Sequence, residues 1–212
     1  RSTLFPYTTL FRSGSASIAA NCRMCLVEVE KAPKPLPACA TPVTDGMVVH
    51  THSKMAKQAQ EGVMEFLLIN HPLDCPVCDK GGECQLQDLA VGYGKSTTRY
   101  TEAKRAVVAK DMGPLISTRE MSRCIHCSRC VRFTEEIAGN QEIGIANRGE
   151  HSEILTFIGR AVETELSGNV IDLCPVGALT SKPFRFNARS WELNRRKSVL
   201  NQIGRASCRE RV

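Results

Sequence analysis

The spacing of the cysteine residues constrains this chain more than any other feature of its sequence. Ten of the 11 cysteines in the 212 residues fall into three groups: Cys22, Cys25 and Cys39; Cys75, Cys78 and Cys84; Cys124, Cys127, Cys130 and Cys174. Several thiols in so short a stretch cannot readily find separate disulfide partners with relaxed geometry, and C-x-x-C disulfides are usually redox-active rather than structural. The spacing therefore favours metal ligation. No secretory signal is visible, so we expect a reducing compartment.

The segment "CIHCSRC" places three cysteines on one short loop with the spacing C-x2-C-x2-C. A distant Cys-Pro pair, separated from Cys130 by 43 intervening residues, supplies a fourth thiolate from Cys174. This is the bacterial ferredoxin pattern for a [4Fe–4S] cluster, whereas zinc sites favour two ligand pairs separated by a longer spacer. The position that carries a second-cluster cysteine in two-cluster ferredoxins is Thr134, so we expect one cluster here.

The segment "HPLDCPVCDKGGEC" carries His71, Cys75, Cys78 and Cys84. A three-cysteine zinc site with a histidine is one interpretation of this spacing. The adjacent glycines Gly81 and Gly82 favour a backbone that passes close to a bulky group, and a chain with one iron–sulfur cluster is a candidate for more. We therefore expect a [4Fe–4S] cluster on which His71 replaces one thiolate. A neutral imidazole makes such a cluster less negative, which by simple electrostatics raises its reduction potential.

The segment "NCRMCLVEVE" contributes Cys22 and Cys25, and Cys39 follows with the spacing C-x2-C-x13-C. This spacing suits a [2Fe–2S] site of the ferredoxin kind. A fourth ligand is missing from the neighbourhood. Cys208 stands apart from the three groups, and we expect it to have no role.

The two ends of the chain differ from the rest. Residues 1–13 and 203–212 show no sustained helical or strand period and resemble translated adaptor sequence, so we exclude them from fold reasoning. Each of these segments carries a net charge of +2, which leaves +2 of the formal +6 for residues 14–202. The charge therefore gives little support to nucleic-acid binding. The sequence also contains no run of about 18 apolar residues, the minimum for a transmembrane helix.

Local patterns predict short elements around the cysteine groups. Alternation in "CLVEVEK" predicts a strand with Val27 and Val29 on one face, the proline-rich stretch "APKPLPACATPV" predicts a loop, and "GMVVHT" predicts a second strand. Ser53 is a candidate N-cap of a helix whose apolar residues recur near a 3.6-residue period: Met55, Ala59, Val63, Phe66 and Leu67. Further helices are expected in "QLQDLAVGYG", closed by Gly92 or Gly94, and in "VRFTEEIAG", ending at Gly139, and Pro175 suits the first turn of a helix.

Several charged and polar residues lie beside the predicted ligands. His126, inside the tight cysteine loop, is expected to pack or to support the ligands rather than to bind metal. Arg123, Arg129 and Arg132 flank the same loop, and solvated surface charge is the default interpretation. Stabilisation of a reduced, anionic cluster is the alternative.

Four segments together resemble one known family: "NCRMCLVEVEK", "NHPLDCPVCDKGGECQLQD", "SRCIHCSRCVRF" and "DLCPVGALTSKPFRFNARSWEL". Their order and spacing are similar to the N-terminal iron–sulfur region of the G chain, the large peripheral-arm subunit of respiratory complex I (NADH:quinone oxidoreductase). The resemblance covers roughly residues 15–200. It implies two [4Fe–4S] clusters and one [2Fe–2S] cluster. In that family the binuclear site has a fourth cysteine where this chain has Phe11, so we expect that site to be incomplete.

The resemblance implies an α+β fold of small units. We expect a truncated β-grasp [2Fe–2S] ferredoxin-like domain at 14–52. A helical domain at 53–106 follows, with a [4Fe–4S] cluster held by one histidine and three cysteines, and then a small α/β [4Fe–4S] ferredoxin-like domain at 107–182. Residues 183–202 begin a molybdopterin-oxidoreductase-like domain that this chain truncates.

The resemblance also implies electron relay. Electrons pass from the flavin-bearing, NADH-binding subunit towards quinone, within a peripheral arm on the cytoplasmic face of the bacterial inner membrane or the matrix side in mitochondria. No catalytic residue is expected, and no G-x-G-x-x-G motif follows a predicted strand. The iron–sulfur arm of a hydrogenase or formate dehydrogenase is the first alternative, and a zinc-binding interaction module is the second. Thr134 and the 43-residue gap favour complex I over the first.

Overall fold

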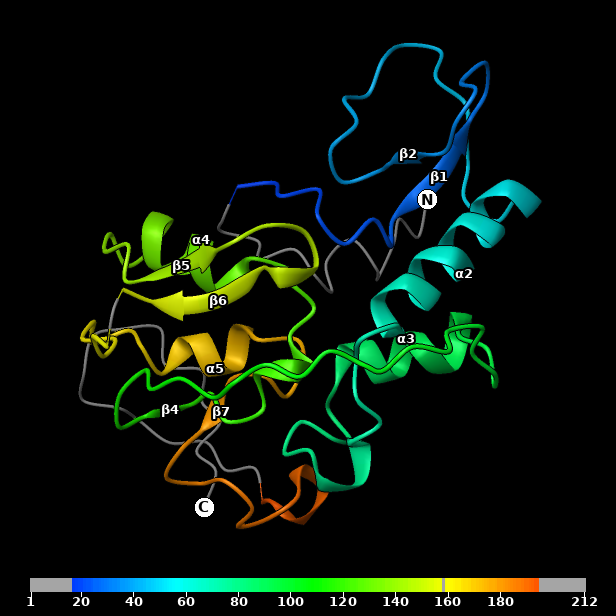
Figure 1. The fold of residues 1–212 in the computed structure, drawn as a ribbon. Coiled ribbons are helices and arrows are strands. Elements are labelled where there is room, and N and C mark those ends of the chain that lie inside the picture. The colour runs from blue at the N-terminus through cyan, green and yellow to red at the C-terminus, as the bar shows by residue number, and fades with distance from the viewer. Residues whose placement is uncertain (1–16, 158, 195–212) are drawn as a thin grey trace.

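The computed structural model describes residues 17–157 and 159–194. Figure 1 shows the chain passing through a projecting β-unit, a helical unit and a mixed unit of short helices and strands. Residues 1–13 and 203–212, which the sequence analysis left out of fold reasoning, lie outside the described residues. Within the described part of the chain, no helix has the length and apolar character needed to cross a bilayer.

A three-stranded antiparallel sheet with the order β2-β1-β3 forms the first unit. Strand β1 (Leu26–Val29) lies between β2 (Leu36–Pro37) and β3 (Val49–His50). Val27 and Val29 are buried, as the alternation predicted. The stretch expected to be only a loop contributes β2, where a proline is tolerated because the strand lies at the sheet edge.

Helix α2 (Lys54–Leu68) connects this sheet to the cysteine loops, and it contacts both β1 and α3 (Figure 1). Ser53 caps it as predicted, because its Oγ accepts a hydrogen bond from the Ala56 N–H at 3.2 Å. The helix buries Ala56, Gln60 and Met64, whereas Phe66, one of the residues whose spacing predicted the helix, is 74% exposed. The helix was predicted correctly, but the face predicted to be buried was not. The buried residues are those on the face that contacts β1 and α3.

The second ligand-bearing loop follows α2 directly. Its short 3₁₀ turn η1 (Cys75–Val77) leads to helix α3 (Gln85–Tyr93), and Gly94 ends this helix by donating its N–H to the Ala90 carbonyl at 2.8 Å. The helix predicted after Cys84 is therefore present in the structure, and it ends at Gly94.

The third unit contains two small antiparallel ribbons. Strand β4 (Ile116–Ser117) pairs with β7 (Thr180–Ser181), and β5 (Ile143–Ala146) pairs with β6 (Glu153–Thr156). The helices and 3₁₀ turns of this unit and of the segment after it are α4 (Arg129–Glu136), α5 (Asn169–Leu173), η2 (Met121–Arg123), η3 (Gly149–His151) and η4 (Ser190–Glu192).

Two details of the third unit concern the predicted helices. The helix in "VRFTEEIAG" forms as α4, and Gly139 follows it with a left-handed φ of +73°. The predicted helix start at Pro175 is wrong: α5 ends before Cys174, and Pro175 follows it in an irregular turn. A Cys-Pro pair at the end of a helix uses the proline to stop the helix rather than to begin one.

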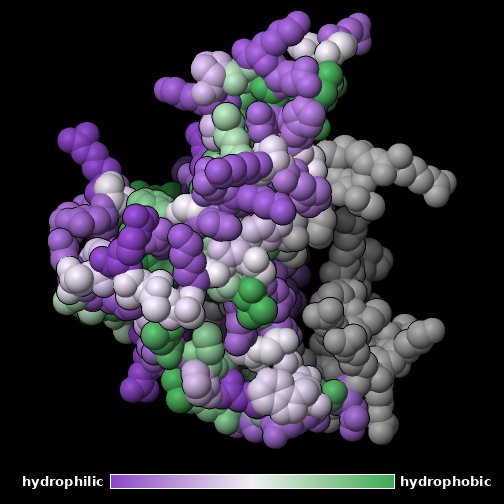
Figure 2. All heavy atoms as spheres, turned by 90° about the vertical axis from the view of Figure 1, so that its right-hand side faces the viewer, coloured by the Kyte–Doolittle hydropathy of each residue, from purple (hydrophilic) through white to green (hydrophobic). Residues whose placement is uncertain are grey.

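The main hydrophobic core joins the second and third units. It packs Met64, Leu86 and Leu89 from the helical unit against residues of the mixed unit such as Ile143 and Val170, and it includes the thiols of Cys84, Cys130 and Cys174. A separate small cluster around Val27 and Val29 serves the β-unit. Figure 2 shows that unit projecting from the rest with a largely hydrophilic surface on the visible face. Two predicted ligand sets therefore adjoin the main core.

Candidate metal centres

A small, partly open cavity lies at the loop between α2 and α3. All four predicted ligands of this segment line it: His71, Cys75, Cys78 and Cys84. Asp74, Arg123 and Gly177 also contribute to its walls. Among the described residues, no three histidine, cysteine or acidic side chains are placed to hold a single metal ion. All four predicted ligands nevertheless line one cavity, and ligands spread around a cavity suit a multi-iron cluster.

Two glycines, Gly81 and Gly177, line this cavity and let the backbone approach it closely. A Cβ on Gly177 would lie 2.2 Å from Sγ of Cys78, and a Cβ on Gly81 would lie 2.8 Å from the Cys75 carbonyl oxygen. Gly82 adopts a φ of +88°, which residues with a side chain rarely adopt. Gly81 therefore lies where the sequence analysis expected a close approach, whereas a Cβ on Gly82 would meet Trp191 rather than a predicted ligand, and Gly177 adds a close approach from the other unit.

His71 lies in this cavity with the properties of a neutral ligand. Burial lowers its pKa to about 4, while a hydrogen bond with the backbone of Arg123 opposes the shift. Its Nδ1 is buried and has no hydrogen-bond partner among the described residues. A neutral imidazole with one nitrogen unpartnered and the ring held by a backbone contact is the form in which histidine binds metals.

Cys84 occupies the N-terminus of α3. Burial raises the pKa of its thiol, but the backbone N–H groups of Leu86 and Gln87 lower it. These amides and the helix dipole favour a thiolate at this position. The helix that the sequence predicted after Cys84 therefore also serves the ligand itself.

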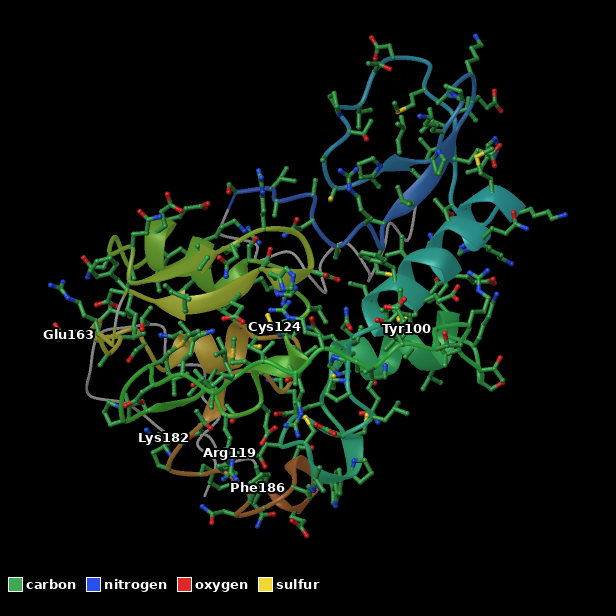
Figure 3. The ribbon with its side chains drawn as sticks, in the orientation of Figure 1. Tyr100, Arg119, Cys124, Glu163, Lys182 and Phe186 are labelled. Carbon is green, nitrogen blue, oxygen red and sulfur yellow. The ribbon has the colours of Figure 1, made fainter. Side chains whose placement is uncertain are left out.

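A second cavity contains the all-cysteine set. Cys124, Cys127, Cys130 and Cys174 all line it, together with apolar residues such as Ile154 and Leu179. Figure 3 shows Cys124 near the middle of the molecule, where β6 and α5 lie on either side of it. The 43-residue connection between Cys130 and Cys174 holds the β5–β6 hairpin and α5, and it returns the fourth cysteine to the loop.

These four thiols form a set that favours a positively charged metal partner. Burial raises the pKa of Cys124 to about 12 and that of Cys127 to about 11, and it also raises the pKa of Cys130 well above that of a free thiol. The neighbouring thiols also oppose ionisation of one another. Thiolates are the form that binds metals, so metal binding here must supply the free energy of deprotonation.

Two non-glycine residues of the loop 124–130 adopt left-handed backbone conformations. His126 has a φ of 52° and Ser128 a φ of 57°, a region that residues with a Cβ adopt infrequently. The turn aims the His126 N–H at Sγ of Cys124, 3.4 Å away. The His126 ring contacts the Ser152 carbonyl oxygen at 2.8 Å, in agreement with its predicted supporting role.

Thr134 occupies the position at which a cysteine would serve a second cluster. It is fully buried in α4, and its hydroxyl donates to the Val131 carbonyl at 2.9 Å and lies 3.3 Å from the Cys130 carbonyl. The side chain therefore contributes to its own helix.

The first cysteine group is also brought together. The Cys39 N–H lies 3.5 Å from Sγ of Cys25. Burial raises the pKa of Cys39 to about 11, and the neighbouring thiols of Cys25 and Cys22 contribute to the same shift. Phe11, at the position of the missing fourth ligand, lies outside the described residues.

The three arginines beside the tight loop are not solvated, so the default prediction was wrong. Arg123, Arg129 and Arg132 are all buried. Arg123 lines the His71 cavity, although it directly precedes Cys124 of the other set, and Arg129 lines the all-cysteine cavity. The sequence analysis assigned all three arginines to one site because they are close in sequence to the same cysteine loop. The packing between units, which separates them, cannot be read from the sequence.

The sequence analysis also did not predict that the segment from Arg189 to Trp191 lies over the His71 loop. We call this segment the strap. Arg189 donates from Nη1 to the Cys78 carbonyl at 2.6 Å and from Nη2 to the Pro76 carbonyl. Trp191 lies against Gly82, where a Cβ would be 2.7 Å from the indole ring. The quoted segment "DLCPVGALTSKPFRFNARSWEL" contains both residues, but nothing in its spacing indicated which loop they cover.

Comparison with known families and structures assigns the three segments separately. Residues 5–54 match a 2Fe-2S iron-sulfur cluster binding domain, residues 60–99 the NADH-ubiquinone oxidoreductase-G iron-sulfur binding region, and residues 113–180 the ferredoxin-like domain of NADH-quinone oxidoreductase subunit 3. The first match begins inside the segment 1–13 that we excluded from fold reasoning. The fold and the cysteine sites therefore define an iron–sulfur protein with ferredoxin-like 2Fe-2S and 4Fe-4S domains.

Curated relatives identify the family more narrowly. The chain is 60% identical over 182 residues to the G subunit of NADH-quinone oxidoreductase from Rickettsia conorii, and 60% identical over 183 residues to the NADH-ubiquinone oxidoreductase 75 kDa subunit of Reclinomonas americana. Each alignment covers 86% of this chain. The chain belongs to the family of the NADH-quinone oxidoreductase G subunit. It spans only 27% and 26% of the length of these two relatives.

A solved structure shares the architecture. An NAD+-reducing [NiFe]-hydrogenase in the H2-reduced state matches with a TM-score of 0.73 and 27% sequence identity, over 84% of this chain and 76% of that chain. The alternative that we drew from the sequence therefore has a structural counterpart. Its sequence identity is less than half of that to the Rickettsia and Reclinomonas relatives.

Proposed function

We propose that the chain is an electron-relay segment of an NADH:quinone oxidoreductase. Bound iron–sulfur clusters supply reversible one-electron chemistry. The protein supplies ligands, fixed charges and exclusion of water, and no catalytic residue is assigned.

The ligand assignment rests on two small cavities. We assign His71, Cys75, Cys78 and Cys84 to one [4Fe–4S] cluster, and Cys124, Cys127, Cys130 and Cys174 to a second. The single observation that carries the proposal is that each cavity is lined by all four members of one predicted set. The all-cysteine set is the stronger case, because Cys174 reaches its cavity from a segment far along the chain.

The [2Fe–2S] assignment is weaker by one ligand. Cys22, Cys25 and Cys39 supply three thiols, and position 11 holds phenylalanine where the family pattern has cysteine. We propose that this site binds an incomplete or unstable cluster in the present sequence. The matching 2Fe-2S domain supports the class of site and leaves its occupancy to experiment.

The two four-ligand sites are neighbours. Sγ of Cys84 lies 3.7 Å from the carbonyl oxygen of Pro175, which directly follows Cys174 of the other set. The thiols of Cys84 and Cys174 are both buried in the main core. Close, dry neighbouring sites are what electron transfer between clusters requires, and the Cys174–Gly177 segment supplies the shared wall.

The partners follow from the family. We propose that other peripheral-arm subunits of complex I, including the flavin-bearing NADH-binding subunit, contact the full-length protein. The proposed location is the cytoplasmic face of the bacterial inner membrane, or the matrix side in mitochondria. The proposed units remain 14–52, 53–106, 107–182 and the start of a larger domain at 183–202.

The arm of a hydrogenase is the second candidate function. The structural match to the NAD+-reducing hydrogenase favours it, since that protein shares the fold over most of both chains. Isolation of the full-length gene product from its source membrane separates the two, because quinone reduction by the purified assembly supports the relay in complex I and hydrogen oxidation supports the alternative.

Cofactor content tests the proposal directly. The 212-residue chain is purified without oxygen, reconstituted with iron and sulfide, reduced and examined by low-temperature EPR alongside assays for iron and acid-labile sulfide. We expect signals of two [4Fe–4S] clusters. A colourless protein with stoichiometric zinc and no labile sulfide would instead identify a zinc-binding interaction module.

A further inference from the structure

Arg123 is placed between the two predicted four-ligand sites. Its backbone directly precedes Cys124 of the all-cysteine set, whereas its side chain lines the cavity of the His71 set. The side chain is only 4% exposed. A buried guanidinium loses most of its hydration, so its position must be set by partners in the protein.

The partners of Arg123 belong to both units. Nε and Nη2 each lie 3.0 Å from Oδ2 of Asp74, the residue before Cys75. Nη1 lies 3.5 Å from the carbonyl oxygen of Gly177, the residue against which Cys78 packs. The backbone of Arg123 forms a hydrogen bond with His71. Arg123 therefore contacts one predicted ligand of this site directly and the neighbours of two others.

The charges of the Arg123–Asp74 pair do not cancel at the cavity. The Asp74 side chain is 35% exposed, so water screens its negative charge, whereas the guanidinium of Arg123 is almost fully enclosed. Electrostatic interactions grow stronger as solvent is excluded. The net field of the pair at the His71 cavity is therefore positive.

We propose that Arg123 tunes the reduction potential of the His71 site as a fixed buried cation, with Asp74 as its opposing partner. This inference rests on the proposed function, because it requires a cluster in that cavity. Reduction adds one negative charge to the site. A buried positive charge stabilises the reduced state and raises the midpoint potential, and a nearby carboxylate lowers it. Arg123 is a positioning and tuning residue, and no ligand role is assigned to it.

Arg129 provides a matched control. It is a buried arginine that lines the all-cysteine cavity, where its Nη1 lies 3.3 Å from the Leu173 carbonyl. The two arginines have the same charge and similar burial. Their effects should therefore separate by site: Arg123 acts on the His71 signal, and Arg129 acts on the all-cysteine signal.

The test is an EPR-monitored redox titration of the anaerobically reconstituted chain. Four variants are compared with the unchanged chain: Arg123→Gln, Asp74→Asn, the double variant and Arg129→Gln. We expect Arg123→Gln to lower the midpoint potential of the His71-site signal and Asp74→Asn to raise it. The double variant should lie between the two single variants. Arg129→Gln should shift the all-cysteine signal more than the His71 signal.

The opposite signs distinguish tuning from a purely structural role. Loss of packing would shift both single variants in the same direction or reduce their iron content without a change in potential, and either result would overturn the inference. If Arg123→Gln loses its cluster, two other variants test the inference. Asp74→Asn must still raise the midpoint potential of the His71-site signal. Arg123→Lys, which keeps the positive charge, must have a midpoint potential closer to that of the unchanged chain. Absence of both cubane signals from the unchanged chain would contradict the proposed function itself.

Discussion

Gly177 and Cys78 approach each other so closely that a side chain on the glycine would collide with the sulfur. A Cβ at position 177 would lie 2.2 Å from Sγ of Cys78, although 98 intervening positions separate the two residues in the sequence. The contact joins the segment after Cys174 to the His71 loop. It shows that the ligands of one site depend on the unit that carries the other.

Substitution of Gly177 by alanine should therefore disrupt the His71 site. We expect Gly177→Ala to lose the EPR signal and a corresponding share of the iron of this site, because the Cβ would displace Cys78. Gly62→Ala is the matched control: position 62 has open space around it and lies inside α2, where alanine stabilises a helix by about 0.5–1 kcal/mol relative to glycine. Equal iron content in both variants would contradict the expectation.

Replacement of His71 by cysteine should lower the reduction potential of one cluster. A thiolate adds a negative charge where the neutral imidazole adds none. EPR-monitored titration of His71→Cys should show one shifted cubane signal and one unchanged signal. His151→Gln serves as the control, since this imidazole is 80% exposed and is not among the proposed ligands. An unchanged spectrum and potential for His71→Cys would remove His71 from the ligand set.

Removal of the Arg189 side chain should expose the His71 loop to solvent. Arg189 binds the carbonyl oxygens of Cys78 and Pro76, and its guanidinium lies 5.9 Å from the centre of the Trp191 ring. We expect Arg189→Ala to release iron to a chelator several-fold faster than the unchanged chain, as followed by absorbance. Arg119→Ala is the control: this side chain is 74% exposed, and it is labelled in Figure 3. Equal release rates in the two variants would show that the strap does not protect the site.

Gln60 should contribute to the stability of the β-unit. It is buried in α2, and its Nε2 donates to the Leu26 carbonyl of β1 at 3.0 Å. Gln60→Ala leaves that carbonyl without its donor and creates a small cavity, which should lower the free energy of unfolding by about 1–3 kcal/mol. Gln58→Ala, on the exposed side of the same helix, should change it by less than about 0.5 kcal/mol. Thermal unfolding of both variants measures the difference, and similar transition temperatures would contradict this role.

Much of the local structure could be predicted because its causes are local. The alternation around Val27, the Ser53 cap and Gly94 at the end of α3 each depend on neighbours within a few residues, and the structure agrees with all three. The prediction at Pro175 was wrong because local sequence does not distinguish two roles of proline. It is common both in the first turn of a helix and just after a helix ends. Only the position of α5 before Cys174 decides between them.

The buried arginines show where local reasoning ends. A basic residue in a polar sequence is exposed in most proteins, so Arg123, Arg129 and Arg132 were expected in solvent. Arg123 is instead enclosed by Asp74 and Gly177, which come from two other segments of the chain. Contacts with distant segments also explain why Phe66 is exposed and Gln60 is buried in α2. The face of this helix that contacts β1 and α3 is the one that becomes buried.

By itself, the order and spacing of cysteine and histidine determined the class of protein and the grouping of its predicted ligands, because each ligand loop is short and its members are held together by the covalent chain. Tertiary structure alone decided which distant residues surround each group: Gly177 against Cys78, Arg123 beside His71 and Arg189 above the loop. These contacts join segments far apart in the sequence. Their existence depends on the packing of whole units around a common core, which no short pattern encodes.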